Sequence, residues 1–87
     1  MDIEFDPAKD AANKAKHGLS LAEAAEFDLA RAVVVVDDRR EYGEARFRGL
    51  GRVDGELRSL VFPVRGTIIR VISYRRAHEK EMRRHER

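Results

Sequence analysis

The spacing of apolar residues changes twice along this chain and divides it into helical and extended parts. From residue 32 the apolar residues become β-branched, and from residue 44 apolar and polar side chains alternate as they do on strands. After Tyr74 only Ala77 and Met82 are apolar. Before these parts comes an alanine stripe at helical spacing, formed by Ala8, Ala11, Ala12 and Ala15. The order predicts helices first, then a sheet, then a charged terminal helix.

Capping signals set the bounds of the two N-terminal helices. Asp6-Pro7 starts a helix, because Asp accepts hydrogen bonds from free amides and Pro lacks only a donor that would be unpaired there. Gly18 supplies a left-handed stop, so the first helix is predicted over Pro7 to His17. The capping box at Ser20 to Glu23 predicts a second, short helix from Leu21 to Phe27 or Asp28. Its expected core contacts are Leu21, Ala24, Ala25 and Phe27.

Four strands are predicted in the middle of the chain, over 32–36, 44–53, 57–64 and 68–74. The first is so rich in valine that both of its faces are expected to be covered. Asp54-Gly55 is a two-residue hairpin signal, and Arg65-Gly66 is the next tight turn. Pro63 falls late in the third strand. The predicted fold is one α+β domain over residues 1–87, with two N-terminal helices, a four-stranded, mainly antiparallel sheet and a C-terminal helix.

Composition narrows the class of protein. The chain of 87 residues has no cysteine, which excludes disulfides and thiolate chemistry. Its acidic start lacks the features of a signal peptide, and no apolar run approaches a membrane span. We therefore expect a soluble protein of the cytoplasm.

Charge is distributed unevenly along the chain. Residues 1–30 contain three Lys/Arg and seven Asp/Glu, whereas residues 31–87 contain fifteen and nine. The excess of basic side chains is concentrated in residues 65–87, which contain eight basic and three acidic side chains. A basic half of this kind is typical of a surface that faces a polyanion, although Glu–Arg pairing on a solvated helix also produces it.

The candidate chemistry comes from cations and histidines. Arg75-Arg76 is expected to place two neighbouring guanidinium groups at the end of a rigid strand, where they can hold one phosphate. Lys16-His17 ends the first helix. RNA cleavage without a metal needs a base for the 2′-hydroxyl, cations for the pentavalent phosphate and an acid for the leaving oxygen, which these residue types supply. Structural interpretations without a catalytic role also exist. Lys16-His17 can interact favourably with the C-terminal end of the helix dipole, and Arg70 can pair with an acidic side chain. His78, Met82 and His85 share one face of the predicted terminal helix, so either His can pack on the sheet.

A metal site is the competing chemical hypothesis. Four carboxylates surround one predicted turn and are suitable oxygen ligands for Mg²⁺, namely Asp37, Asp38, Glu41 and Glu44. No His or Cys stands at ligand spacing beside them, and acidic turns are usually solvated. We expect no metal and no cofactor.

An ordered set of motifs resembles the BrnT toxins of bacterial type II toxin–antitoxin pairs. The motifs span nearly the whole chain in this order: F-D-P-A-K and A-x-N-K-x-K-H-G-L-S within residues 5–20, E-A-A-E-F-D at 23–28, D-D-R-x-x-Y-G-E-x-R at 37–46, R-G-T-I-I-R-V-I-S at 65–73, and Y-R-R-A with a later Glu. Two departures stand out. Phe62-Pro63 replaces a frequent Tyr-Thr, and His85 stands where relatives often have an aromatic, commonly Tyr.

The resemblance implies a RelE-like ribonuclease that cuts RNA, blocks translation and is neutralised by a BrnA-like ribbon-helix-helix antitoxin. The complex would then bind operator DNA through the antitoxin. By family match Arg75 and Arg76 are the first catalytic candidates, with Lys16, His17 and Arg65 in support, and His85 a catalytic candidate if it replaces the Tyr. The candidates for RNA binding are Arg46, His78, Arg83 and Arg84.

Three functional hypotheses therefore stay open at the level of sequence. The first is a metal-independent endoribonuclease toxin. The second is a basic module that binds nucleic acid or the ribosome without catalysis. The third is a metal-dependent nuclease that uses the carboxylates around residues 37–44.

Overall fold

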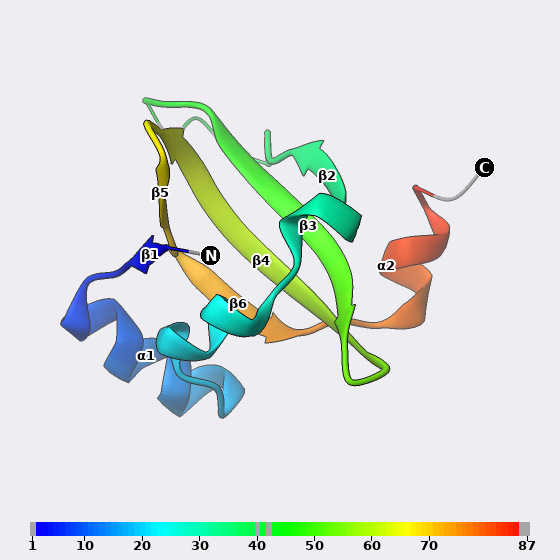
Figure 1. Cartoon of the computed structure of the whole chain (residues 1–87), viewed down its shortest axis with the longest axis horizontal. Coiled ribbons are helices and arrows are strands. Elements are labelled where there is room, and N and C mark those ends of the chain that lie inside the picture. Colours follow the sequence, from blue (N-terminus) through cyan, green and yellow to red (C-terminus); the bar gives the residue numbers. More distant parts are fainter. Residues whose placement is uncertain (1, 40, 42, 86–87) are drawn as a thin grey trace.

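A computed structural model describes residues 2–39, 41 and 43–85, except for the side chains of residues 64 and 65. The elements follow in the order β1 (Ile3–Glu4), α1 (Pro7–His17), the 3-10 helices η1 (Leu21–Glu26) and η2 (Leu29–Arg31), β2 (Val33–Val36), β3 (Arg46–Val53), β4 (Glu56–Arg65), β5 (Ile68–Arg70), β6 (Ser73–Arg76) and α2 (Glu79–Arg83). Figure 1 shows the long hairpin of β3 and β4 at the centre, with α1 and α2 at opposite ends. The α+β class predicted from sequence is confirmed.

The capping signals at the N-terminus act as predicted. The Asp6 side chain accepts a hydrogen bond from the Ala8 amide at 2.8 Å, and Gly18 ends α1 with a left-handed φ of 74°. The Ser20–Glu23 capping box is also present, but it begins a 3-10 helix rather than an α-helix. Of the predicted core contacts, Leu21, Ala24 and Phe27 are buried as expected, and Ala25 was wrong because it is exposed. The alanine stripe of α1 is also exposed to solvent.

Antiparallel hairpins form most of the sheet. β3 pairs with β4 along its whole length, and the connecting turn has positive φ at both Asp54 and Gly55, as a type I′ turn requires. The main path through the sheet is β1-β5-β4-β3-β2, and β6 pairs with β4 beside β5. The short β1, which the sequence pattern did not predict, pairs with β5 in parallel.

The predicted final strand is divided into two. β5 pairs with β4 at Val64 and Arg65, whereas β6 pairs with Arg58 to Val61, and the register shifts by one residue between them. The Val61 carbonyl accepts from the Ile72 amide at 2.9 Å, so Val61 faces β6. Pro63, two residues on, faces the same neighbour but has no N–H to donate. This missing donor accounts for the interruption of the strand.

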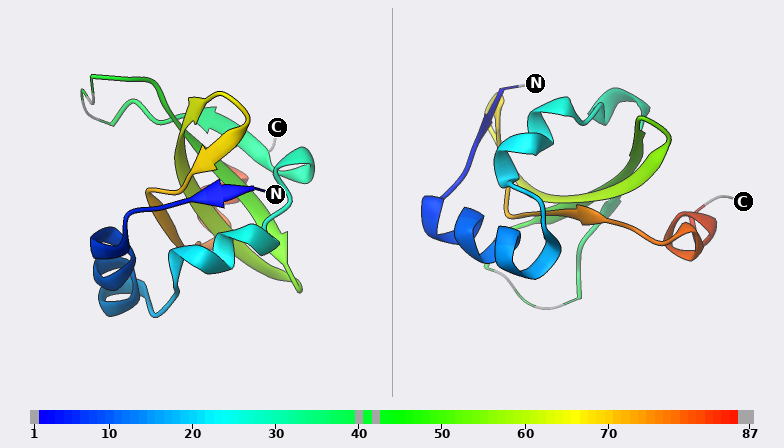
Figure 2. Two further views of the ribbon diagram at one scale, coloured as in Figure 1. Left: turned by 60° about the vertical axis from the view of Figure 1, so that its left-hand side comes forward. Right: turned by 90° about the horizontal axis from the view of Figure 1, so that it is seen from below.

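The sheet has two faces of different character. Its core face carries Phe47, Leu60, Phe62 and Tyr74, and η1 packs on it with Leu21, Ala24 and Phe27. At the far end of the other face, α2 inserts Met82 against Leu50 and Leu57. Figure 2 shows η1 and η2 on one side of the sheet, with α1 and α2 at its two ends. The rest of the second face is therefore not covered by η1, η2 or α2.

The prediction that both faces of the valine strand are covered was wrong. β2 is the edge of the sheet path, and its side chains alternate between half-buried and exposed. Val34 and Val36 are 46% and 61% exposed. A valine run by itself does not distinguish a central strand from an edge, because its intrinsic preference is the same in both.

Candidate active site on the basic face of the sheet

We call the open part of the second face the basic face, and it consists of Arg46, Arg48, Ser73 and Arg75. Cross-strand register places these side chains together, since Arg48 lies opposite Val61, and Val61 opposite Ser73. A pocket of about 330 Å³ opens on this face. Its lining residues are Lys16, His17, Asp37, Arg39, Arg46, Val61, Ile72, Ser73 and Arg75. The fold thus gathers four of the predicted site residues, Lys16, His17, Arg46 and Arg75, around one pocket.

Arg75 is held in a fixed orientation by α2. Its Nη1 and Nη2 donate to the two carboxylate oxygens of Glu81 at 3.1 and 2.7 Å, and Nη1 also donates to the Arg76 carbonyl. Hydrogen bonds from Arg75, with a smaller contribution from the His78 amide, lower the pKa of Glu81 to about 2. The guanidinium has five N–H groups, so Nε and the second hydrogen of Nη2 keep another bidentate edge. That edge has no protein partner among the described residues.

Arg76 lies on the opposite face of the sheet. Its Nε is 3.2 Å from a carboxylate oxygen of Glu56, and its register partner is Arg58. Successive side chains of a strand point to opposite faces, so an adjacent pair on β6 cannot line one pocket. The sequence-based picture of two neighbouring guanidinium groups on one phosphate was therefore wrong for Arg75 and Arg76.

His17 is the lining residue of this pocket whose ordinary pKa lies closest to neutral pH. Burial lowers its pKa from 6.5, and the positive charges of Lys16 and Arg75 lower it further. These effects prevail over the C-terminal end of α1, which alone would favour the protonated form. A lowered pKa keeps the imidazole neutral at pH 7, which is the form that accepts a proton.

Asn13 fixes α1 against the sheet and so brings Lys16 and His17 to β6. Its side-chain amide donates to the carbonyls of Leu19 and Tyr74, each at 2.8 Å, and its oxygen accepts from the Tyr74 amide at 3.3 Å. Asn13 is the buried residue of α1. Sequence reasoning missed it, although a lone Asn among the alanines and charged residues between Pro7 and His17 was an available signal.

Arg48 was also missed as a site residue. Its Nε is buried and makes no hydrogen bond within the described part of the chain, and the same holds for the buried Ser59 hydroxyl on this face. The positive charge of Arg48 contributes to the lowered pKa of both Asp37 and Glu81. The available signal was alternation, because Arg46 and Arg48 are two apart on one strand.

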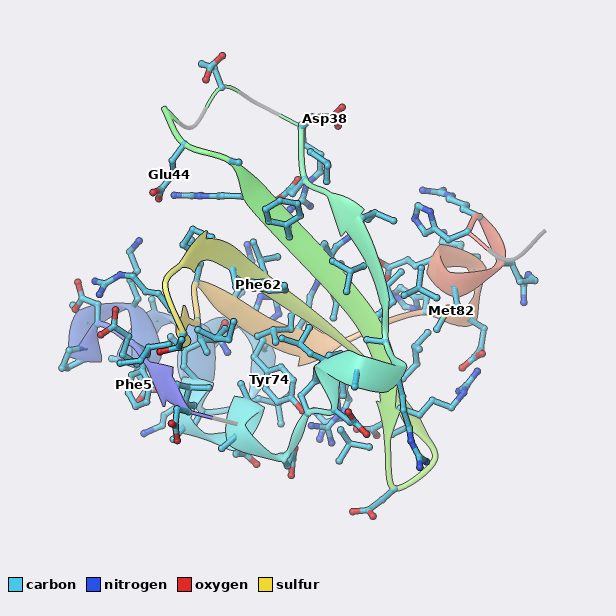
Figure 3. All side chains as sticks on the ribbon, turned by 45° about the horizontal axis from the view of Figure 1, so that its top comes forward. Phe5, Asp38, Glu44, Phe62, Tyr74 and Met82 are labelled. Atoms are coloured by element: carbon cyan, nitrogen blue, oxygen red, sulfur yellow. The ribbon has the colours of Figure 1, made fainter. Side chains whose placement is uncertain are left out.

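The predicted carboxylate cluster lies at the end of this pocket. Asp37 is buried and is engaged by Arg39, whose Nε and Nη2 donate to its two oxygens at 2.6 and 2.8 Å. Hydrogen bonds from Arg39 are the main reason that the pKa of Asp37 is lowered. Asp38, Glu41 and Glu44 are exposed, and Figure 3 shows Asp38 and Glu44 on the loop beyond β2 and β3. Among the described residues no group of three or more His, Cys, Asp or Glu is placed to hold a metal.

The other predicted residues whose side chains are described do not line the pocket. His78 caps α2, and His85 follows it, so the predicted helical face shared with Met82 was wrong; Met82 is buried while both histidines are exposed. Arg83 and Arg84 are exposed at the end of α2. The Arg65 backbone pairs with Ile68, but its side chain lies outside the described part of the structure. The Arg70–Glu4 pair confirms the structural interpretation of Arg70.

A comparison with protein families now decides the class. The model described as "Ribonuclease toxin, BrnT, of type II toxin-antitoxin system" matches residues 5–81. The chain belongs to this family. The matched range holds every described residue that lines the pocket on the basic face, and it ends at Glu81, the partner of Arg75. His85 lies beyond it.

A solved BrnT structure supports the assignment. The chain is similar to the Brucella abortus ribonuclease toxin BrnT, known from a crystal structure, with a TM-score of 0.71 and 29% sequence identity. The alignment covers 90% of this chain and 97% of the Brucella chain. A search of curated proteins found no match. Within the described residues, no helix combines the length and apolar character needed to cross a membrane.

Proposed function

We propose that this BrnT toxin cuts RNA without a metal, in the pocket between α1 and β6. The observation that carries the proposal is the convergence of His17, biased towards its neutral form, with Lys16, Arg46 and Arg75. This set supplies a base and three cations in one place. The family's ribonuclease activity and the residues of this chain therefore point to the same chemistry.

In the proposed reaction His17 takes the proton of a ribose 2′-hydroxyl. The 2′-oxygen attacks the adjacent phosphorus, and the bond from phosphorus to the 5′-oxygen breaks. The leaving oxygen takes a proton from Lys16 or from solvent, which leaves a 2′,3′-cyclic phosphate and a 5′-hydroxyl. DNA lacks the attacking group, so only RNA is a substrate.

Arg75 stabilises the extra negative charge of the pentavalent phosphate. Its remaining bidentate edge matches two phosphate oxygens, and Glu81 holds the guanidinium in place before the substrate arrives. Removing one such donor typically costs about 10²–10³ in rate. Arg46 lines the same pocket from β3 and adds a second guanidinium.

The neighbouring arginines provide a matched test. Arg75→Ala is expected to reduce the cleavage rate of purified toxin by about 10²-fold or more. Arg76→Ala removes the same charge from the next position but on the opposite face, so it is expected to change the rate little. Equal losses in both variants would contradict the site. A wild-type protein that binds RNA and never cleaves it would contradict the reaction and favour a binding module.

We further propose that cleavage blocks translation and that a BrnA-like ribbon-helix-helix antitoxin neutralises the toxin and carries the complex to operator DNA. Membership of a type II toxin family supports a protein antitoxin, and the motif set supports the BrnA type and a RelE-like fold for this single domain. Co-expression with the product of a neighbouring ribbon-helix-helix gene tests the partner. Growth that stays arrested would contradict it.

A further inference from the structure

A second pocket continues the proposed site along α1. It measures about 270 Å³ and shares Lys16, His17, Ile72 and Ser73 with the pocket on the basic face. Four shared lining residues make the two pockets parts of one groove. The second part adds Lys9, Ala12 and Asn13, which all belong to α1.

Among the described lining residues, the two ends of this groove have opposite net charge. Lys9 and Lys16 flank the α1 end, and none of its described lining residues is acidic. At the other end a third pocket shares Asp37 and Arg46 with the site and is lined also by Asp38, Glu41 and Glu44. A phosphate backbone is attracted to the first end and repelled by the second. A bound polyanion that extends beyond the site is therefore expected to run towards the α1 end of the groove.

Lys9 is placed to receive a phosphate. It is exposed, and no ion pair involves it among the described residues. Lys9 and Lys16 are seven residues apart on α1, which places them about 10 Å apart along the helix axis. A strand of a few nucleotides bound at the basic face therefore reaches Lys9 as well.

We infer that the α1 groove binds the single-stranded RNA that flanks the cleaved bond, with a phosphate at Lys9 and a sugar against Ala12 and Ile72. This inference rests on the proposed function of the site. Apart from His17, the described lining residues include no aromatic side chain on which a base stacks. Contact through phosphate and sugar makes the groove tolerant of sequence at the nucleotide it holds.

A matched pair of lysines tests the groove. Lys14 lies on the same helix and is also exposed, but it pairs with Asp10 at 3.3 Å and does not line the groove. Lys9→Ala and Lys14→Ala remove the same charge from the same element. Because both side chains are on the surface, circular dichroism of each variant is expected to match the wild type.

The measurement is the cleavage of oligoribonucleotides extended on one side or the other of the cut bond. Lys9→Ala is expected to raise KM about two- to fivefold for substrates extended on one side only, with kcat unchanged, as loss of one exposed charge contact predicts. In a plot of the logarithm of the RNA binding constant against the logarithm of the salt concentration, the magnitude of the slope is expected to fall by about 0.7. This is the value for one phosphate contact with a single strand. Lys14→Ala is expected to change neither quantity.

Two results would overturn the inference. One is an equal effect of both lysine variants, which would show a general effect of net charge. The other is a Lys9→Ala variant with normal RNA cleavage but weaker antitoxin binding, which would assign the groove to the protein partner. If the wild type binds RNA without cleaving it, the proposed reaction fails, and the same pair of variants still decides the groove through RNA dissociation constants.

Discussion

The Arg75–Glu81 pair offers a quantitative test of how α2 supports the site. A change of the Glu81 pKa from 4.5 to about 2 corresponds to roughly 3 kcal/mol of differential interaction. Part of this belongs to the hydrogen bond from the His78 amide, and the Arg75 side chain is 25% exposed, so water screens the pair. We therefore expect a coupling free energy of about 1–2 kcal/mol between Arg75 and Glu81.

The assay is a double-mutant cycle measured by urea unfolding. Arg75→Met keeps most of the alkyl packing, and Glu81→Gln keeps the shape of the side chain while removing its charge. Glu79→Gln is the matched control, because Glu79 lies on the same helix but pairs with Arg52 where both side chains are about half exposed. The control is expected to change stability little. A coupling within about 0.5 kcal/mol, the range of independent sites, would refute the structural role of the pair.

The pH dependence of the free energy of unfolding gives a second test of the Arg75–Glu81 pair. Because the folded pKa of Glu81 is lower than its unfolded value, the charged form stabilises the protein above pH 4.5, and this contribution is lost as the pH falls from 4.5 to about 2. Glu81→Gln lacks the titrating group. The stability difference between wild type and variant is therefore expected to shrink across this window. A constant difference would contradict the pKa.

Three further predictions concern the site and its support. His17→Asn is expected to lower cleavage by about 10²-fold or more and to remove the acidic limb of the pH–rate profile, which should lie below pH 6.5 in the wild type. Asn13→Leu leaves backbone groups of Leu19 and Tyr74 without a partner and is expected to cost roughly 2–4 kcal/mol by chemical denaturation. Excess EDTA is expected to leave cleavage unchanged; loss of activity restored by Mg²⁺ would favour the metal-dependent alternative.

The parts of the fold that depend on neighbouring residues were predictable from the sequence. Asp6 and Gly18 bound α1, and the type I′ turn at Asp54-Gly55 joins β3 to β4. Each of these features follows from a hydrogen bond or a φ preference within a few residues. Alternation along β3 likewise placed Arg46 and Arg48 on one face. Such local preferences depend only on residues close in the sequence, so they hold whatever the tertiary packing around them.

The candidate site was predictable in composition but not in arrangement. The residue types Lys16, His17 and Arg75 were identified, while the pairing of Arg75 with Glu81 and the loss of Arg76 to the opposite face were not. Strand alternation requires two adjacent arginines to point to opposite faces, but the sequence does not say which face carries the helices. Only the packing of η1 on the core face decides that Arg75 is the one left in the pocket.

What the sequence determined by itself was the α+β class, the order of the main helices and strands, most of their caps and turns, and the basic residue types of the candidate site. What the tertiary structure alone decided was which cations meet. Asn13 and Tyr74 are far apart in the chain, and their hydrogen bonds bring the end of α1 to β6 beside Arg75. Pro63 and the division of the last strand into β5 and β6 set where β6 begins. Contacts between distant segments have no local signature, because they depend on the free energy of the whole packed domain.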